Sequence, residues 1–276
     1  FRMSAKLIDG KQIAAEIEAE LKLKVSKMDK APRLSVVQVG EDPASTSYIR
    51  AKSNAAERVG IDLTHHHLSE TISKSDLEKL VINLNETEDG IIIQLPLPEG
   101  LDEVLDLIEP ENDVDGFHSE NLGKLVQGIS GMVPCTPAGI IELLYRSGND
   151  PEGKHVVVVG RSTIVGTPLS LLLSQKGVDA TVTLCHSRTK SLHEHCKQAD
   201  ILVAAVGKAN MITKDMVKPG AVIIDVGVNR TSEGLVGDVS HDVRDVASQI
   251  TPVPGGVGPM TVVMLMSNTV KSALEN

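Results

Sequence analysis

Runs of consecutive apolar residues alternate with amphipathic segments along most of the chain. A short apolar run predicts a strand buried on both faces, the pattern of a parallel sheet covered by helices. An amphipathic segment with apolar residues three and four apart predicts a helix. Strands are predicted at 33–39, 61–67, 90–95, 156–160, 181–185, 201–207 and 221–228, and helices at 9–28, 45–60, 75–84, 136–148, 168–177, 191–197 and 262–274. Strands and helices in this alternation predict an α/β fold with a parallel, right-handed, doubly wound sheet.

Two polar segments mark helix starts, and a third marks a link between domains. Ser45 or Thr46 is the expected cap of the second helix, and Ser75 opens a capping box for the third. The segment 149–153, NDPEG, has the composition of a surface link. The chain is therefore expected to form two α/β domains that are joined through this link.

The segment from His155 to Pro168, HVVVVGRSTIVGTP, carries the strongest local signal. Gly160 ends a buried strand where the backbone must turn sharply, and Gly166 allows a close approach of the chain. Thr167 is the expected N-cap of the next helix, with Pro168 at its first position. A glycine turn between a strand and a helix N-terminus predicts a phosphate-binding site. The alternative is a plain strand-to-helix turn, because the glycine spacing is not that of the common dinucleotide fingerprint.

Composition and charge exclude several classes of protein. The 276 residues are 41% hydrophobic with two Phe, two Tyr and no Trp, so the core must be aliphatic. A net charge of −10 argues against broad binding to nucleic acid. No apolar run has the length of a membrane span, and the start shows no signal-peptide pattern. The three cysteines lack metal-site or disulfide spacing, which favours a reducing cytoplasm.

Basic side chains near the predicted phosphate site indicate which dinucleotide it binds. The second strand of an NAD site is usually followed by an acidic residue that holds the ribose hydroxyls. Here that strand is followed by Ser187 and Arg188 without a carboxylate, and Arg161 lies in the glycine turn. These side chains favour NADP over NAD, unless the two arginines are ordinary solvated residues.

Lys52 is the strongest catalytic candidate. It lies four residues after Tyr48 on a predicted helix, so the two side chains share one face. A partly desolvated lysine has a lowered pKa and exchanges protons near neutral pH. The alternative is a surface lysine whose stem covers apolar neighbours.

A strand-end amide and a turn carboxylate are the next candidates. Gln94 lies near the carboxyl end of a predicted strand, where α/β folds bind ligands, and Asp115 lies in the acidic turn 111–118. An amide and a carboxylate together can bind the donor and acceptor edge of a pterin or a base. Alternatively, Asp113 and Asp115 form the turn or a weak cation site, but without further carboxylates nearby no metal is expected.

Two histidine groups and one glycine-rich loop complete the candidates. The histidines at 65–67 and at 193–195 lack partners at ligand spacing, so both groups are interpreted as surface features. The segment 254–259, PGGVGP, has backbone suited to a close approach to a ligand, or to a mobile hinge.

Six segments, in one order and over nearly the whole chain, resemble the bifunctional methylenetetrahydrofolate dehydrogenase/methenyltetrahydrofolate cyclohydrolase family. They are VGEDPASTSYIRAK (39–52), GIIIQLPLP (90–98), PENDVDGFH (110–118), PCTPAG (134–139), VVGRSTIVGTP (158–168) and TPVPGGVGPMT (251–261). The resemblance implies two α/β domains with a cleft between them. One is a catalytic folate-binding domain at 3–139, completed by the C-terminal helix at 262–276; the other is a Rossmann-type NADP-binding domain at 140–261. It also implies a cytoplasmic homodimer formed through the Rossmann domains.

The resemblance further implies an activity and a role for each matching residue. NADP-dependent oxidation of 5,10-methylenetetrahydrofolate to 5,10-methenyltetrahydrofolate is followed by hydrolysis to 10-formyltetrahydrofolate, in one-carbon metabolism that supplies purine biosynthesis. Lys52 is the implied general acid and base of the hydrolysis, Tyr48 positions the folate and that lysine, Gln94 tunes Lys52, and Asp115 anchors the pterin. The remaining implied folate-site residues are Ile93, Leu95, Pro254, Gly255, Gly256, Gly258, Pro259 and Thr261, and the implied NADP-site residues are Gly160, Arg161, Ser162, Ile164, Ser187 and Val228.

The chain departs from the family pattern at two positions near Lys52. Asn54 stands where the family has a second lysine, and Ala56 stands where it has a cysteine. The resemblance therefore implies no role for these two side chains. Two alternative functions stay open: a dehydrogenase without effective cyclohydrolase activity, and a non-catalytic nucleotide-binding regulator.

Overall fold

The computed structural model describes residues 4–276, so Met3, where the first predicted domain begins, lies outside the described residues. The chain divides into two compact units. The first, called the Rossmann unit below, contains the chain up to Ala14, residues 125–128 and residues 134–261. The second, called the catalytic unit, contains residues 15–124, 129–133 and 262–276.

The Rossmann unit contains a six-stranded sheet in the order β1-β11-β8-β7-β5-β6, in which each pair of neighbours is parallel. Its strands are β1 (Lys6–Leu7), β5 (His155–Val159), β6 (Thr181–Cys185), β7 (Ile201–Ala204), β8 (Val222–Asp225) and β11 (Gln249–Ile250). Its helices are α5 (Cys135–Arg146), α6 (Gly166–Ser174) and α7 (Leu192–Lys197), with short 3-10 helices η2 (Lys214–Met216) and η3 (His241–Asp245). The expected doubly wound parallel sheet is confirmed.

The order of the strands places the ligand end of this sheet. The chain passes from β5 to β6 on one side and returns to β7 on the other side of β5. Open α/β sheets bind ligands where the strand order reverses in this way, outside the carboxyl ends of the strands. Val156 to Val159 are all at most 1% exposed, which explains their uninterrupted apolar run. Gly160, immediately after β5, therefore lies at the expected binding edge.

Several very short strands carried no sequence signal. The chain adds β1 and β11 to one side of the sheet, and β9 (Asn229–Thr231) pairs with β10 (Gly234–Val236) as an antiparallel hairpin. These strands have two or three residues each, too few to show a period of two.

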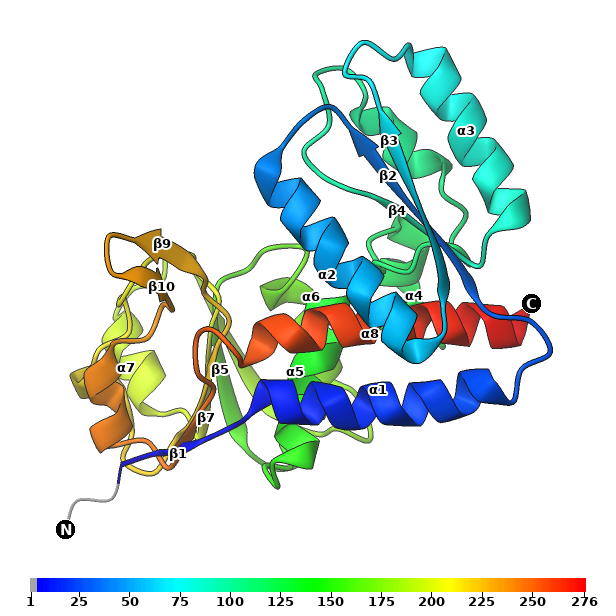
Figure 1. Ribbon diagram of the computed structural model, residues 1–276. Coiled ribbons are helices and arrows are strands. Elements are labelled where there is room, and N and C mark those ends of the chain that lie inside the picture. The colour runs from blue at the N-terminus through cyan, green and yellow to red at the C-terminus, as the bar shows by residue number, and fades with distance from the viewer. Residues whose placement is uncertain (1–3) are drawn as a thin grey trace. The chain divides into compact units, whose positions relative to one another are not determined.

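The catalytic unit contains a three-stranded parallel sheet in the order β3-β2-β4. Its strands are β2 (Arg33–Val39), β3 (Asp62–Leu68) and β4 (Gly90–Ile93), and its helices include α2 (Pro43–Val59), α3 (Lys74–Thr87) and the 3-10 helix η1 (Asp102–Leu107). Figure 1 shows α2 and α3 on opposite sides of this sheet. Residues from β2, β4, α3 and η1 form one buried aliphatic cluster. The apolar runs that predicted β2 and β4 therefore supply side chains to a buried core. Helices α1 (Gly10–Ser26), α4 (Ser119–Gln127) and α8 (Val257–Glu275) contribute residues to both units.

The structure corrects the expected helix caps. Helix α2 is capped by Asp42, whose side chain accepts a hydrogen bond from the Ala44 amide, and not by Ser45 or Thr46. Helix α3 is capped by Ser73 instead of Ser75. In each case another residue with a capping side chain lies two to four positions before the expected cap. The residues between the two positions can adopt helical backbone, so the helix begins at the first of them.

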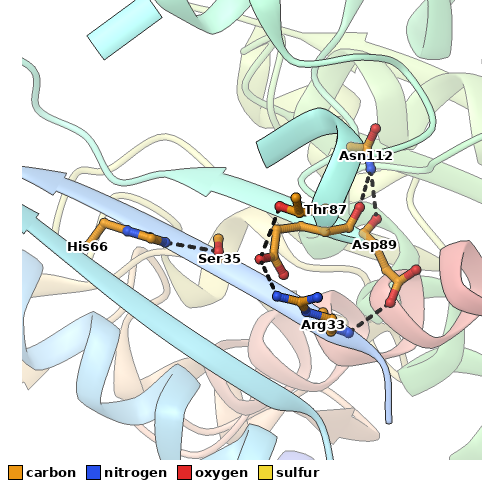
Figure 2. Close-up of polar contacts among 7 residues, drawn as sticks. Arg33, Ser35, His66, Thr87, Asp89 and Asn112 are labelled. Carbon is orange, nitrogen blue, oxygen red and sulfur yellow. Dashed lines mark hydrogen bonds and ion pairs between the residues drawn. The ribbon is translucent and has the colours of Figure 1, made fainter. Parts of the chain in front are cut away.

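Polar side chains close the amino end of the catalytic unit's sheet (Figure 2). The Arg33 guanidinium contacts the Glu88 carboxylate at 3.4 Å, while the Arg33 amide donates to Asp89 Oδ2 at 2.8 Å. The Asn112 side-chain amide donates to the carbonyls of Glu88 at 2.7 Å and Asp89 at 3.4 Å. These bonds attach the segment around Asn112 to the start of β4.

No helix within residues 4–276 is long and apolar enough to span a bilayer.

Candidate active site

Lys52 and Gln94 meet at the carboxyl end of the catalytic unit's sheet. Lys52 lies on α2, and Gln94 directly follows β4, where its backbone amide extends the ladder by donating to the Val37 carbonyl at 2.8 Å. The Lys52 Nζ donates to Gln94 Oε1 at 2.7 Å. The amide oxygen therefore fixes the lysine amine in one position, although 42 residues separate the two in the chain.

Asp115 brings a carboxyl group into the electrostatic field of this pair. Burial raises the pKa of Asp115 to about 6. The positive charge of Lys52 opposes that rise, and the negative charge of Asp113 adds to it. At neutral pH Asp115 is therefore ionised, but it holds a proton far more readily than an exposed aspartate.

These three side chains line one cavity of about 440 Å³. Apolar groups form the rest of its wall, among them Ile93, Leu105, Ile108 and Phe117. A cavity of this size with a few convergent polar groups suits a flat, polar-edged ring system. The sequence missed Leu105, Ile108 and Phe117; only Phe117 lies in a segment that it singled out.

Tyr48 and two neighbours of Lys52 lie apart from the cavity wall. Tyr48 is one turn before Lys52 on α2, and 56% of the residue is exposed. Tyr48 is not one of the residues that line the cavity in the described part of the chain. Asn54 is exposed and Ala56 is buried, and neither is among the residues that line the cavity in the described part of the chain.

The glycine-rich segment 254–259 lies in the Rossmann unit and leads directly into α8. The helix begins at Val257, earlier than expected, so Gly258 and Pro259 are in its first turn. Gly255 has φ +98°, and a Cβ at Gly256 would lie 2.5 Å from the Pro252 carbonyl oxygen. Only glycine fits at these two positions. The peptide bonds before Pro96 and Pro254 are both cis.

The turn after β5 is tightly folded around Gly160. Gly160 has φ +115°, and its amide donates to the Cys185 carbonyl of neighbouring β6 at 2.9 Å. Thr167 is not the N-cap: α6 begins at Gly166, and the Thr167 hydroxyl donates to the Arg161 carbonyl at 3.0 Å. The turn itself supplies the cap-like contacts, since the Ser162 hydroxyl accepts from the Val165 amide at 3.1 Å. The helix also ends at Ser174, before Gly177.

The side chains around this turn fit a phosphorylated dinucleotide. Arg161, Ser162 and Ile164 are exposed in the turn, Ser187 and Arg188 are exposed after β6, and Val228 is exposed after β8. Neither arginine forms an ion pair with another residue in the described part of the chain. A guanidinium group in the turn before a helix N-terminus and a second one after the neighbouring strand, with no carboxylate in either segment, suit a pyrophosphate and a 2′-phosphate.

Two buried aspartates that the sequence did not single out hold the backbone beside Val228. Asp238 accepts hydrogen bonds from the amides of Val206, Gly207 and Lys208 at 2.7 to 3.0 Å. Asp225 accepts from the amide of Gly227 at 3.1 Å, and burial raises its pKa to about 6. Their only sequence signal is a carboxylate within two residues of a glycine, which is also the signal of an ordinary turn.

The histidine groups do not form a site. His65 and His67 stack with ring centroids 5.5 Å apart, and their Nε2 atoms bind Gln38 Oε1 and the Gly40 carbonyl. His193 pairs with Asp215 at 3.0 Å. Among residues 4–276 no three His, Cys, Asp or Glu side chains gather as a metal site.

Comparison with known proteins gives one family. The model of the tetrahydrofolate dehydrogenase/cyclohydrolase catalytic domain matches residues 8–115, and that of the NAD(P)-binding domain matches residues 134–276. The chain is 53% identical over 280 residues to the bifunctional protein FolD of Brevibacillus brevis, covering 98% of both chains. The crystal structure of the bifunctional enzyme FolD from Campylobacter jejuni matches with a TM-score of 0.94 and 44% identity over 99% of both chains. The Trypanosoma brucei enzyme complexed with NADP and an inhibitor matches with a TM-score of 0.89 and 38% identity, again over 99% of both chains.

Proposed function

The chain belongs to the tetrahydrofolate dehydrogenase/cyclohydrolase family, and from this premise we propose which of its residues carry each of the two reactions. The protein is a bifunctional enzyme that oxidises 5,10-methylenetetrahydrofolate with NADP and hydrolyses the product to 10-formyltetrahydrofolate. The observation that carries the assignment of residues is the Lys52–Gln94 hydrogen bond in the same cavity as Asp115.

NADP, when bound, would supply the hydride acceptor for the oxidation of the one-carbon bridge to the methenyl level. Arg161, Ser187 and the amino end of α6 are the groups that would hold its phosphates, and exposed Val228 would pack against it. Ser162 and Ile164 complete the turn, and Gly160 allows that turn to fold.

Asp115 orients the folate. A pterin presents N–H donors along one edge, and an ionised carboxylate accepts two of them at once. The apolar wall of Ile93 and Leu105, together with Leu95, covers the faces of the ring. Residues Pro254, Gly255, Gly256, Gly258, Pro259 and Thr261 are proposed to line the folate site as well, because they match the family's segment.

Lys52 moves the protons of the hydrolysis. Water attacks the methenyl carbon, and the lysine amine takes a proton from it as the C–O bond forms. The C–N5 bond then breaks, and the lysine returns a proton to N5; the second water proton leaves to solvent. Gln94, 2.7 Å from the amine, orients it, and Tyr48, one turn away on the same helix face, is proposed to position the folate beside it.

We further propose a homodimer formed through the Rossmann unit and a cytoplasmic location. The family resemblance supports the dimer, and all three cysteines are buried as thiols, which is compatible with a reducing compartment. Sedimentation equilibrium should give twice the chain mass, and a monomer at micromolar concentration would contradict the dimer.

The test is Lys52→Met beside Lys79→Met, an exposed lysine on α3 outside the cavity. Lys52→Met should lower the turnover of methenyltetrahydrofolate hydrolysis by about 100-fold or more, the size of a general acid–base contribution, while NADP still binds. Lys79→Met should match wild type in both activities. If Lys52→Met leaves hydrolysis unchanged, the role of Lys52 is wrong and the dehydrogenase reaction alone becomes the better assignment.

A further inference from the structure

Asp113 is a buried carboxylate in the wall of the same cavity, and the roles proposed above leave it without a part in either reaction. Only 6% of the residue is exposed. Its Oδ1 accepts from the Gly116 amide at 3.2 Å, and its Oδ2 accepts from the His118 amide at 2.8 Å and from Asn121 Nδ2 at 3.0 Å. Two of these donors belong to the turn that contains Asp115, and the third comes from α4.

Other buried groups hold the same turn from outside. The Ile91 amide of β4 donates to the Asn112 carbonyl at 2.9 Å, and the Asn112 side chain is bound to the carbonyls of Glu88 and Asp89 (Figure 2). The Asn268 side chain donates to the Val114 carbonyl at 2.8 Å. The residues on both sides of Asp115 are therefore fixed, and Asp113 is the charged group of that framework.

The charges around Asp115 come from three elements. Lys52 faces it from α2, Asp113 lies in its own turn, and Asp106 and His118 line the same cavity. Asp113 opposes the ionisation of Asp115, and Lys52 favours it. Asp113 thus acts on its neighbour through both backbone geometry and charge.

We propose that Asp113 is a positioning residue for the folate: its carboxylate fixes the turn that aims Asp115 into the cavity, and so sets the substrate affinity of both reactions. The inference rests on the proposed role of Asp115 as the pterin anchor. Asp113 does not itself contact the substrate in this assignment. An asparagine at this position cannot replace it, because its amide nitrogen faces an N–H donor in either orientation.

The experiment compares Asp113→Asn with Glu111→Gln, which removes an exposed charge two residues earlier in the same segment. Asp113→Asn should raise KM for both folate substrates by about tenfold and change kcat by less than about threefold, the pattern of lost substrate binding. The dissociation constant of NADP, measured by fluorescence titration, should stay within about twofold of wild type and shows that the Rossmann unit is folded, while the retained kcat shows that the catalytic unit is folded. Glu111→Gln should match wild type.

The pH profile separates positioning from a merely structural role. Without the negative charge of Asp113, the acidic limb of kcat/KM should move to lower pH, since Asp115 then ionises more easily. A variant that is only less stable would show a lower melting temperature with KM and the acidic limb unmoved, and that result would overturn the proposal. If Asp113→Asn does not fold, Asn121→Ser removes one donor to Asp113 and keeps its charge; KM should then rise by about threefold, and no change would also overturn it.

Asp115→Asn, measured alongside, distinguishes this inference from the proposed function. If Asp115→Asn leaves KM unchanged, the pterin anchor is wrong, and Asp113 has nothing to position. If Asp115→Asn raises KM while Asp113→Asn does not, the anchor stands and only the positioning role fails.

Discussion

Replacing Asp238 by asparagine tests how the cofactor end of the Rossmann unit is built. The Asp238 carboxylate is fully buried and accepts four hydrogen bonds. Oδ2 accepts from the amides of Val206 and Gly207, while Oδ1 accepts from the Lys208 amide and from Asn229 Nδ2. The turn after β7 and the start of the β9–β10 hairpin are thus attached to a single side chain.

The arrangement sets the size of the effect. An asparagine has one acceptor oxygen, so either orientation points its amide nitrogen at two N–H donors. Each buried donor left without an acceptor costs about 1–3 kcal/mol, so we expect a loss of about 2–6 kcal/mol. Small movements of the asparagine side chain cannot relieve this loss. The donors at the Oδ2 position are two consecutive backbone amides, and those at the Oδ1 position are a third backbone amide and the Asn229 side chain.

Asp225→Asn is the matched control. Asp225 Oδ1 accepts from the amides of Gly227 and Asp238, but Oδ2 accepts from the Val239 amide alone, at 3.2 Å. An amide nitrogen at the Oδ2 position therefore faces one donor instead of two. Burial also raises the pKa of Asp225 to about 6, so removing its charge recovers part of the cost. We expect a loss below about 2 kcal/mol.

Urea unfolding gives the two free energies, and hydrogen exchange of the peptide that spans 204–210 locates the effect. Asp238→Asn should speed exchange at the amides of Val206, Gly207 and Lys208, and Asp225→Asn should leave them protected. If Asp238→Asn costs no more than Asp225→Asn, counting acceptors is the wrong way to explain this loop.

Three further predictions follow from the structure. Gly160→Ala should abolish detectable NADP binding in a fluorescence titration, because its Cβ would lie 2.1 Å from the Ala205 carbonyl oxygen at φ +115°; the same hydrolysis turnover as wild type would show that the catalytic unit is intact. Arg161→Ala should raise the dissociation constant of NADP far more than that of NAD, since only NADP carries the 2′-phosphate, and equal losses would refute that contact. The raised pKa of Asp225 means that the native state binds the Asp225 proton more tightly than the unfolded state does, so the contribution of Asp225 to the free energy of unfolding falls as pH rises from about 4 to about 6. Urea unfolding across this range should show a smaller fall in the free energy of unfolding for Asp225→Asn than for wild type. An equal fall in both proteins would refute the raised pKa.

The sequence predicts those parts of the fold in which a short run of residues is compatible with only one local structure. The valines of β5 form a continuous apolar run because helices cover both faces of the sheet, and the glycine after them is required by a positive φ. Lys52 and Gln94 could be placed on a helix face and at a strand end, but their 2.7 Å contact depends on the parallel pairing of β2 with β4. Such a contact is a property of topology, not of spacing.

The predictions that failed depended on choosing among adjacent polar residues. Asp42, Ser45 and Thr46 all have side chains that can cap a helix, and the backbone of Pro43 decides in favour of Asp42 because proline fits the first helical turn. Thr167 fails as a cap for a related reason. Gly166 lies against the Gly160 carbonyl, so the helix starts there, and the threonine hydroxyl bonds back to the turn.

The same logic explains why the sequence undervalued the buried aspartates. Asp113 and Asp238 lie next to glycine-containing turns, where aspartate commonly forms a local turn, and neither has a pattern that indicates burial. In the structure each carboxylate instead accepts hydrogen bonds from at least three N–H groups. Asp113 lies two residues before the cavity-lining Asp115, and Asp238 binds Asn229, which follows the exposed Val228. In each unit a buried carboxylate therefore fixes a turn beside residues that are proposed to bind a ligand. Because backbone amides hold each carboxylate, a substitution that removes the carboxylate shifts the turn itself. Substitutions at Asp113 and Asp238 should therefore weaken the binding of substrate or cofactor more than they lower kcat.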